Sequence, residues 1–266
     1  NNTKTTYTYE KETYRLIRLL TTGDNGSCIL QDLHYTFDAT GNITRQFDNA
    51  QKTIFYGGQQ VEAQSDYYYD AIYRLIEANG REHIGQVNSG AQDNWNDDWC
   101  RLSLQPNSPI QMRNYTQKYV YDSVGNILKM QHIAGTVGSW TRNYNYNRAN
   151  NQLTKTTVGS QSYNYTFNEH GSMLTMPHLP LIDWNFREEM QHISLGGGGD
   201  AWYVYDSAGK RIRKVIERAG GKTEERIYLG PYEIYRERNS SNTITHERET
   251  LHIMDDKQRI AMVDSR

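Results

Sequence analysis

A short phrase that returns along the chain constrains its fold more than any other feature. The sequence YDSVGNILK begins at Tyr121, and YDSAGKRIR begins 84 residues later at Tyr205. Each copy has an aromatic residue, then Asp, Asn or Glu, then a few variable residues, Gly or another turn residue, a polar residue and an aliphatic one. Repetition of one local pattern predicts a chain built from stacked copies of one supersecondary unit.

The copies divide into five strong ones and four weaker ones. The strong copies are FDATGNITR at Phe37, YDAIYRLIE at Tyr69, YDSVGNILK at Tyr121, FNEHGSMLT at Phe167 and YDSAGKRIR at Tyr205. The weaker copies are YEKETYRLIR at Tyr9, YNRANNQLTK at Tyr146, WNFREEMQH at Trp184 and MDDKQRIAM at Met254. Most copies lie 17 to 32 residues apart, so the pattern extends over most of the chain.

Each copy has the features of a β-hairpin corner. The Asp side chain can accept backbone N–H bonds, as in an Asx-turn, and Gly tolerates a positive φ. Residues on both sides alternate in character, and the aromatic residue before Asp can pack across strands. The structural turn residues predicted in this way are Tyr9, Phe37, Asp38, Gly41, Tyr69, Asp70, Tyr121, Asp122, Gly125, Phe167, Gly171, Tyr205, Asp206 and Gly209.

The amino-acid composition favours an all-β protein without a large hydrophobic core. Hydrophobic residues make up 36% of the 266 residues, and exchanging the 21 Tyr for the 21 Gly to match the usual count leaves this fraction unchanged. Ordinary globular domains have roughly 45–50%. The many Tyr and Thr residues and the few Pro residues indicate an extended sheet whose faces are partly exposed to water. We therefore expect repeated antiparallel β-hairpins in one long, spiralling, curved sheet, in which each unit packs only on its neighbours.

One repeat segment is predicted over residues 1–266, with three interruptions. Residues 83–114 are rich in Asn, Asp, Gln, Gly and Ser and predict a long loop excursion off the sheet. The segment MPHLPLIDW, residues 176–184, suits an extended edge or a segment packed against the sheet. The segment SLGGGGDAW, residues 194–202, predicts a flexible loop between two copies.

Charge and cysteine content exclude several classes of partner. The net charge is −2, with 29 basic and 31 acidic residues interspersed, so neither a nucleic-acid stripe nor a polybasic membrane patch is indicated. The chain has no apolar run long enough for a membrane span, and NNTKTTYTYE does not have the order of a signal peptide. Cys28 and Cys100 are expected to be ordinary free cysteines.

Three turn sequences resemble a catalytic motif. Asp38-Ala-Thr-Gly, Asp122-Ser-Val-Gly and Asp206-Ser-Ala-Gly resemble the Asp-Thr/Ser-Gly loops of aspartic proteases, in which two carboxylates share a proton. Here one extra residue separates Asp from Gly, and the same positions recur in the other hairpins. The turn interpretation is favoured, and a hydrolase that uses Asp122 and Asp206 is the catalytic alternative.

The remaining patterns also favour structural roles. Gly196–Gly199 lacks the Gly-Lys-Ser/Thr ending of a phosphate loop. His246 and His252 have the spacing of one strand face, but HERETLH is not the His-Glu-x-x-His of a helical zinc site. His178 and Asp183 flank the proline segment without a nucleophile that would complete a hydrolytic triad.

Two further sets of residues could bind ligands. Asp93, Asp97 and Asp98 could offer oxygens to calcium, although they lack the spacing of an EF-type loop. Exposed aromatic rings could stack on sugars or bases, although packing is commoner in repeated hairpins. The tryptophans are Trp95, Trp99, Trp140, Trp184 and Trp202. No catalytic, cofactor-binding or metal-ligating residue is predicted.

The copies FDATGNITR, YDAIYRLIE, YDSVGNILK and YDSAGKRIR resemble the YD-repeat, or Rhs-repeat, proteins over essentially the entire chain. More narrowly, YDAIYRLIEANGREHIGQ, MPHLPLIDW and ETLHIMDDKQRIAMVDSR are similar to the repeat region of bacterial insecticidal toxin complexes, the ABC or Tc toxins, in their B–C component. The resemblance implies a hollow β-shell that encloses a polypeptide toxin cargo, other toxin-complex components as partners, and secretion or delivery to a host. No residue here matches the family's autoproteolytic aspartates, so self-cleavage is not carried over.

Three hypotheses follow. The leading one is a non-enzymatic segment of a toxin-encapsulating cocoon, with no cofactor. The alternative is a glycan- or cell-surface-binding module that uses exposed aromatics such as Trp95 and Trp140, and the third is the hydrolase noted above. An open sheet of about nine hairpins would leave unpaired edges, which favours self-association.

Overall fold

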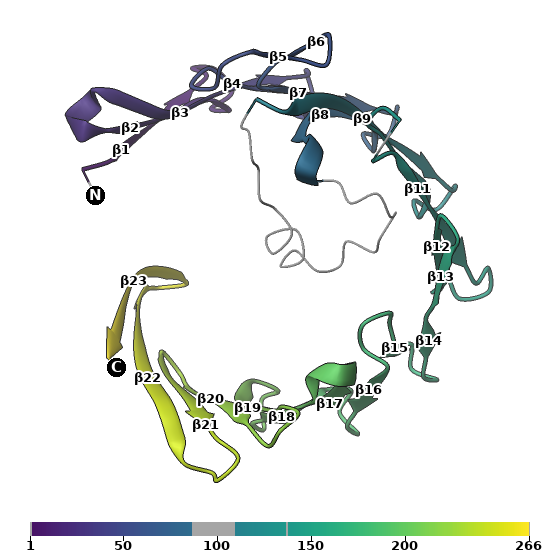
Figure 1. The fold of residues 1–266 in the computed structure, drawn as a ribbon, viewed down its shortest axis with the longest axis vertical. Helices are drawn as coiled ribbons and strands as arrows, with labels where there is room; N and C mark the ends of the chain where they lie inside the picture. The colour runs from purple at the N-terminus through teal and green to yellow at the C-terminus, as the bar shows by residue number, and fades with distance from the viewer. Residues whose placement is uncertain (1, 87–109, 137, 266) are drawn as a thin grey trace. The chain divides into compact units, whose positions relative to one another are not determined.

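The computed structural model describes residues 2–86, 110–136 and 138–265, and these residues form β-strands and three short 3₁₀ helices (Figure 1). Successive strands pair antiparallel, so the predicted all-β class of repeated antiparallel hairpins is confirmed. Contacts divide the chain into two compact units. The units are Asn1–Asn145 with Thr156–Ser162, and Tyr146–Lys155 with Tyr163–Arg266.

The first unit contains the N-terminal part of an eleven-stranded sheet in the order β1-β2-β3-β4-β7-β8-β9-β10-β11-β12-β13. A separate hairpin, β5–β6, interrupts the sequence order between β4 and β7. The elements are β1 (Lys4–Tyr9), β2 (Leu16–Gly23), η1 (Asp24–Gly26), β3 (Cys28–Phe37), β4 (Ile43–Asp48), β5 (Ile54–Tyr56), β6 (Gln59–Val61), β7 (Gln64–Tyr69), β8 (Leu75–His83), η2 (Ile84–Gln86), β9 (Met112–Tyr121), β10 (Ile127–Ile133) and β11 (Trp140–Tyr146). Strand β11 ends at Tyr146, which belongs to the second unit, and strands β12 (Leu153–Val158) and β13 (Gln161–Asn164) also contain residues of both units.

The second unit contains an eight-stranded sheet in which every strand lies beside its neighbours in sequence, from β16 to β23. The small hairpin β14–β15 precedes it. The elements are β14 (Thr166–Phe167), β15 (Met173–Thr175), β16 (Leu181–Trp184), β17 (Met190–Ser194), η3 (Gly196–Gly198), β18 (Asp200–Tyr205), β19 (Arg211–Glu217), β20 (Thr223–Leu229), β21 (Tyr232–Arg238), β22 (Ile244–Asp255) and β23 (Gln258–Ser265). Short connections between sequential strands are typical of a meander.

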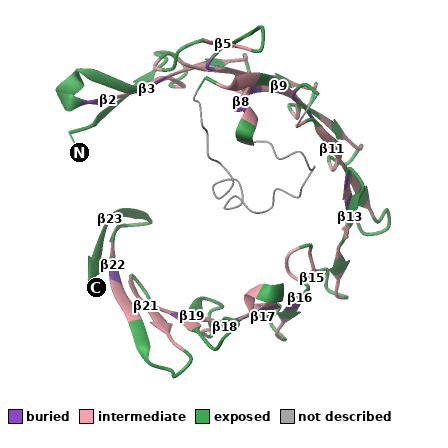
Figure 2. Cartoon of the chain, viewed as in Figure 1, coloured by how far each residue is buried: buried purple, intermediate pink, exposed green. Residues whose placement is uncertain are grey.

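The buried parts of the chain are short and separate, as Figure 2 shows. Most strand residues are half-buried, because a strand in a single sheet has neighbours beside it and few above it. The buried hydrophobic residues of the described part are Val61, Ala63, Ala78, Ala134, Val158, Ile182, Ile193 and Ala201. This small set agrees with the low hydrophobic fraction of the sequence.

In the first unit, the β5–β6 hairpin packs against β9. The side chain of Asn114 in β9 donates to the carbonyl of Gln60 at 3.0 Å. Gly80 in β8 has no room for a side chain, because a Cβ there would lie 2.7 Å from Oη of Tyr115. Gly80 therefore allows the Tyr115 ring to lie flat over β8.

In the second unit, Ile182, Ile193 and Ala201 face one another in direct register across β16, β17 and β18. Met176 and Leu179, from the proline-containing segment, pack against this cluster. The end of that segment is β16, the first strand of the eight-stranded sheet. Apolar residues beside the two prolines thus serve the core of this unit.

Residues 194–202 differ from the flexible loop predicted for them. Residues Gly196–Gly198 form η3, β18 begins at Asp200, and the backbone N–H of Leu195 donates to the carbonyl of Gly199 at 2.8 Å. A Cβ on Gly199 would lie 1.8 Å from the carbonyl oxygen of Glu217. The glycines therefore permit a tight turn pressed against the neighbouring strand, which composition alone does not distinguish from a linker.

The predicted excursion at 83–114 is shorter at both ends. His83 belongs to β8 and pairs with Met112 of β9, so residues 112–114 are strand rather than loop. Residues 87–109 lie outside the described residues. The prediction of one repeat segment over 1–266 remains a prediction.

Candidate functional site

The turn between β3 and β4 has the arrangement that characterises the repeat. Oδ1 of Asp38 accepts backbone N–H bonds from Thr40 at 2.9 Å, Gly41 at 2.8 Å and Asn42 at 2.9 Å. The N–H of Asp38 donates to the carbonyl of Asn42 at 2.9 Å, and that of Gly41 donates to the carbonyl of Asp38 at 3.2 Å. One carboxylate thus satisfies three donors within its own turn.

The same pattern recurs at six further turns. In each, the side-chain oxygen of Asp or Asn accepts from the backbone two and four residues later. These residues are Asp70, Asp122, Asn168, Asn185, Asp206 and Asn239. The turn at Asn239 is absent from the predicted copies because Arg238 replaces the aromatic residue, although Asn239 and Asn242 are typical turn residues.

The three remaining weak copies turn differently. At Tyr9 and Tyr146 the loop is one residue longer, with backbone N–H bonds from Tyr14 to Glu10 and from Asn151 to Asn147. The copy at Met254 lies in β22 and leads into a two-residue turn before Gln258. Met254 is therefore not the corner of a repeat turn of the Asp38 type.

The fourth residue after the aromatic residue has a positive φ in each repeat turn of the Asp38 type. The φ values are +107° at Gly41, +100° at Gly125, +88° at Gly171 and +77° at Gly209. The turns that lack Gly place Tyr73 (+66°), Glu188 (+61°) and Asn242 (+62°) in the same region. Because a left-handed conformation costs roughly 1–2 kcal/mol for an L-residue with a Cβ, Tyr73 and Glu188 show that the turn geometry outweighs that cost.

Three of the aromatic residues connect their hairpin to the preceding one. In each case the polar side-chain atom donates to the backbone carbonyl that lies six residues after the aromatic residue of the previous copy. The pairs are Tyr69 Oη to Ile43 O at 2.7 Å, Tyr121 Oη to Leu75 O at 2.7 Å and Trp184 Nε1 to Met173 O at 2.8 Å. The contact explains why these positions favour Tyr or Trp, whose polar atom bonds while the ring packs.

Arginine side chains form a second connection between hairpins. Nη1 of Arg15 donates to the carbonyl of Asp38 at 2.8 Å, and Nη1 of Arg74 donates to the carbonyl of Asp122 at 3.0 Å. The Arg74 guanidinium also lies 4.7 Å from the ring centroid of Tyr121. Each arginine thus binds the turn of the following hairpin, and these contacts are not apparent from the sequence.

The hydrogen-bond donors around Asp38 and Asp122 lower the pKa of each carboxylate. Hydrogen bonds from the side chain of Asn42 hold the pKa of Asp38 well below its ordinary value, and the side chain of Asn126 lowers the pKa of Asp122, in both cases against the effect of burial. Both carboxylates are ionised and surrounded by donors of their own turn. An aspartic protease dyad instead needs two carboxylates that share a proton. The Asp-x-x-Gly sequences act as turns in the described structure.

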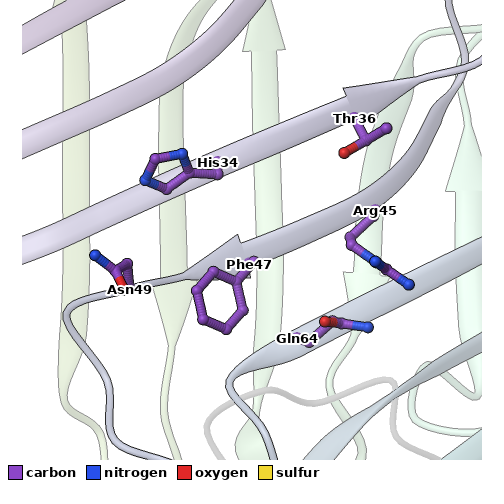
Figure 3. A pocket seen from close by; sticks show the side chains of 6 residues that line it. All are labelled: His34, Thr36, Arg45, Phe47, Asn49 and Gln64. Atoms are coloured by element: carbon purple, nitrogen blue, oxygen red, sulfur yellow. The ribbon is translucent and has the colours of Figure 1, made fainter.

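A shallow pocket of about 510 Å³ lies on one face of β3, β4 and β7 (Figure 3). Direct cross-strand pairing places its side chains next to one another, and the Phe47 ring lies among polar groups. The lining residues are His34, Thr36, Arg45, Phe47, Asn49 and Gln64. Their alternate spacing in two strands is a signal in the sequence, but the pairing of the strands decides that they meet.

Asp32 holds two of these side chains in place. It is 1% exposed and accepts from Arg18 at 2.6 and 3.0 Å, from Nε2 of His34 at 3.1 Å and from Nδ2 of Asn49 at 3.1 Å. The hydrogen bond from Arg18 lowers the pKa of Asp32 to about 2 against the effect of burial, with further lowering from Asn49 and His34. An ionised carboxylate paired with Arg18 thus lies beside the pocket.

In the second unit, His192 of β17 lies between two carboxylates. Its Nδ1 is 2.9 Å from Oδ2 of Asp183 and its Nε2 is 2.9 Å from Oδ1 of Asp200, while its ring stacks on Trp202 with centroids 4.1 Å apart. Burial lowers the pKa of His192, but the hydrogen bonds to Asp183 and Asp200 outweigh it and raise the pKa above its ordinary value. Both ring nitrogens are engaged, so neither is free to act as a base.

Other predicted residues have packing roles or lie outside the described residues. His246 meets the Tyr235 ring edge-on at 6.1 Å, Trp140 stacks on His132 at 5.5 Å, and Cys28 is an exposed free thiol. The residues outside the described part are Asp93, Trp95, Asp97, Asp98, Trp99 and Cys100. Among the residues that the structure describes, no group of three or more His, Cys, Asp or Glu could hold a metal ion. No helix in the same residues is long and apolar enough to cross a membrane.

The fold and its turns define a repeated β-hairpin protein, and comparison with known proteins relates it to toxin subunits. No family model matches the chain. Toxin subunits YenC2 and YenC1 of Yersinia entomophaga are 32% and 30% identical to it over 244 and 248 residues, which are 86% and 88% of this chain. The chain spans 25% of the length of each of these curated relatives.

Solved structures agree with the sequence relationship. A crystal structure of TcdB2-TccC3 superposes with a TM-score of 0.74 and 27% identity over 98% of this chain and 13% of that one. The Photorhabdus luminescens Tc holotoxin pore matches with a TM-score of 0.74 and 28% identity over 99% of this chain and 12% of that one. The chain is therefore related in sequence and fold to subunits of Tc toxins.

Proposed function

We propose that the chain is a non-enzymatic structural segment of a YD-repeat shell that encloses a polypeptide toxin cargo within a toxin complex. The proposal includes the other components of such a complex as partners, and secretion or delivery to a host as its location. The single observation that carries it is a recurring hydrogen bond, in which the aromatic side chain of one hairpin donates to a backbone carbonyl of the preceding hairpin. This bond joins successive hairpins in the same way. The similarity to YenC2 and to TcdB2-TccC3 supports the same role.

The turn geometry supports a structural role for the repeated residues over a catalytic one. In a quasi-one-dimensional protein each hairpin is stabilised by its neighbours, and the residues that recur are those that make the neighbour contacts. Tyr69 makes such a contact in the first unit and Trp184 in the second, while Asp38 closes its own turn. Their side chains are occupied by backbone groups and offer no free nucleophile or base.

The shell role is tested by exchanging this chain for the matching quarter of YenC2. The chimaeric subunit should assemble with its complex, protect an enclosed polypeptide from added protease and keep its toxicity. The same chimaera with Tyr69→Phe, Tyr121→Phe and Trp184→Phe loses the three connections between hairpins and should protect less well. A chimaera that assembles but leaves the polypeptide open to protease would contradict enclosure.

The non-enzymatic part of the proposal has its own test. The Asp122→Asn, Asp206→Asn double variant should behave like the unaltered chain in a screen of peptide, ester and glycoside substrates. A turnover that the unaltered chain shows and the double variant lacks would instead support the hydrolase alternative.

A glycan-binding module is the second candidate function, and the pocket in Figure 3 favours it. An aromatic ring surrounded by hydrogen-bonding side chains is a common arrangement for stacking a sugar ring, and Phe47 has Arg45 and Gln64 as cross-strand or near neighbours. Binding of the chain to a glycan array should then be lost in Phe47→Ala and kept in Phe55→Ala, an exposed ring on the separate β5–β6 hairpin. Absence of binding above background would remove this candidate.

A further inference from the structure

A second pocket, of about 820 Å³, lies at one end of the eight-stranded sheet of the second unit. Three connections meet there: the β18–β19 turn, the β20–β21 turn and the β22–β23 hairpin. The lining residues are Lys210, Gly230, Pro231, His252, Met254, Lys257 and Arg259. The pocket is thus formed by residues far apart in the sequence, and no motif in the chain predicts it.

The lining carries positive charge without a compensating carboxylate. Lys210, Lys257 and Arg259 are all exposed, and none of them has an ion-pair partner among the described residues. Asp255 and Asp256 precede Lys257 in the hairpin but do not line the pocket. Three cations therefore line one concave surface whose lining contains no carboxylate.

Several arginines of the same sheet are paired with glutamates. Arg213 pairs with Glu225 at 2.6 Å, and Arg226 pairs with Glu233 at 2.5 Å. These pairs lie across neighbouring strands and neutralise the sheet locally. Lys210, Lys257 and Arg259 differ from these paired arginines in having no carboxylate partner among the described residues.

His252 fixes the wall of the pocket. Its backbone N–H donates to the carbonyl of Pro231 at 2.8 Å, which holds the β20–β21 turn against β22. Its Nδ1 lies 3.4 Å from Nη1 of Arg259, and its Nε2 lies 3.9 Å from Oε2 of Glu233. The Arg259 guanidinium thus lies next to the His252 ring at the pocket, and no carboxylate among the described residues forms an ion pair with it.

Apolar groups complete the lining. Met254 is 46% exposed and lines the pocket together with Pro231 of the β20–β21 turn. Cations around an exposed methionine match a ligand that carries negative charge next to an apolar group. The negative charge would face the cations, and the apolar group would pack on the methionine.

We propose that this pocket binds an acidic polypeptide segment, with carboxylates placed on Lys210, Lys257 and Arg259 and a neighbouring apolar side chain placed on Met254 and Pro231. A polypeptide fits better than a nucleic acid, because a polypeptide can place carboxylates on the three cations and an apolar side chain on Met254 and Pro231, whereas a phosphate backbone offers no apolar side chain. The inference does not depend on the proposed shell function.

The test is fluorescence anisotropy of a labelled octapeptide that contains Glu-Glu-Leu-Gly twice, titrated with the full chain. The chain should bind this peptide about tenfold more tightly than the matching Lys-Lys-Leu-Gly peptide, and the binding should weaken as salt is raised. The Lys210→Ala, Arg259→Ala double variant should lose about tenfold in affinity. Lys222→Ala, an exposed lysine in the β19–β20 turn outside the pocket, should change it less than about twofold.

Several outcomes would overturn the inference. Equal affinity for the acidic and basic peptides would do so, as would equal losses in the double variant and the Lys222→Ala control. If replacing Leu by Ser has no effect while inorganic phosphate displaces the peptide, the pocket takes small anions instead. Tighter binding of a short single-stranded DNA would assign it to nucleic acid. Since the substituted side chains are exposed, matching circular dichroism of each variant is expected and separates lost binding from lost folding.

Discussion

At the scale of single residues, the repeat turn requires one residue with a left-handed backbone. Tyr73 occupies this position with φ +66°, and its side chain is 57% exposed. Tyr73→Gly removes the steric cost of a Cβ at this φ and gives up little burial, so it should raise the free energy of unfolding by about 1 kcal/mol. Chemical denaturation followed by tyrosine and tryptophan fluorescence measures the change.

The neighbouring residue provides the control for that substitution. Ile72 is 66% exposed in the same turn and has no positive φ. Ile72→Gly adds freedom to the unfolded chain without relieving strain, so it should lower stability by about 0.5–1 kcal/mol. Opposite signs at positions 72 and 73 are expected, and a loss of stability in both variants would contradict the strain at Tyr73.

His192 makes stability depend on pH. Its pKa is raised in the folded protein because the bonds to Asp183 and Asp200 outweigh its burial, so protonation favours folding. The stabilisation is fully present below the unfolded pKa of about 6.5 and is lost as pH rises through the raised folded pKa. Since both aspartates are about half exposed, it should amount to about 1 kcal/mol.

The variant His192→Gln isolates this contribution. The unaltered chain should be more stable than the variant near pH 6, and the difference should shrink as pH is raised to about 9. Urea unfolding at both pH values, followed by the fluorescence of Trp202, gives the two differences. A difference that does not change with pH would show that the imidazole contributes only by packing.

The residues that could be predicted from the sequence are those whose partners are local. Asp38 and Gly41 lie three residues apart, and their hydrogen bonds stay within one turn. Arg15 and Arg74 could not be predicted, because their acceptors lie 23 and 48 residues away and depend on which hairpins become neighbours. The lining of the pocket in Figure 3 could not be predicted either, because the register of the strands decides which side chains lie next to one another.

At the scale of elements, the aromatic side chain stabilises the contact between successive hairpins. Tyr69→Phe keeps the ring and removes the bond to the carbonyl of Ile43, so it should cost about 1–2 kcal/mol. Hydrogen exchange should show faster opening of the amides of β4 and β7. The pKa of Tyr69 is raised by burial, which agrees with a protected hydroxyl.

Tyr68 is the matched control because it is the adjacent residue of the same strand. Its side chain is 52% exposed, and its hydroxyl has no hydrogen bond in the described structure. Tyr68→Phe should change the free energy of unfolding by less than about 0.5 kcal/mol. If both variants open β4 and β7 equally, the Tyr69 hydroxyl does not connect the hairpins.

The strands themselves could be predicted wherever a repeat turn separates two alternating segments. The β5–β6 hairpin is not found by the repeat, because Ile54–Tyr56 and Gln59–Val61 are each three residues long and carry no copy of it. Its signal is Gly57-Gly58, a typical two-residue hairpin turn in which both glycines have a positive φ. The sequence does not distinguish the Gly196–Gly198 helix from a linker, because glycine is common both in flexible loops and in tight turns. Short elements depend on the surface they pack against, which composition does not reveal.

At the scale of the whole molecule, the described sheets have outer strands with one partner each. Strand β1 pairs only with β2, and β23 pairs only with β22. Strand β23 is exposed along its length, and Ile260, Met262 and Val263 are each more than half exposed. An unpaired, apolar strand edge is a template for pairing with another chain.

We expect the purified chain to associate through β23. Val263→Lys places a charge on this strand, which opposes strand pairing between chains, so it should shift the molecule toward the monomer in light scattering coupled to size exclusion. Val124→Lys is the control, because Val124 is 71% exposed in the β9–β10 turn and lies on no strand edge. The control should keep the mass of the unaltered chain. Equal dissociation in both variants would assign association to overall charge, and a monomeric unaltered chain would show that β23 does not pair.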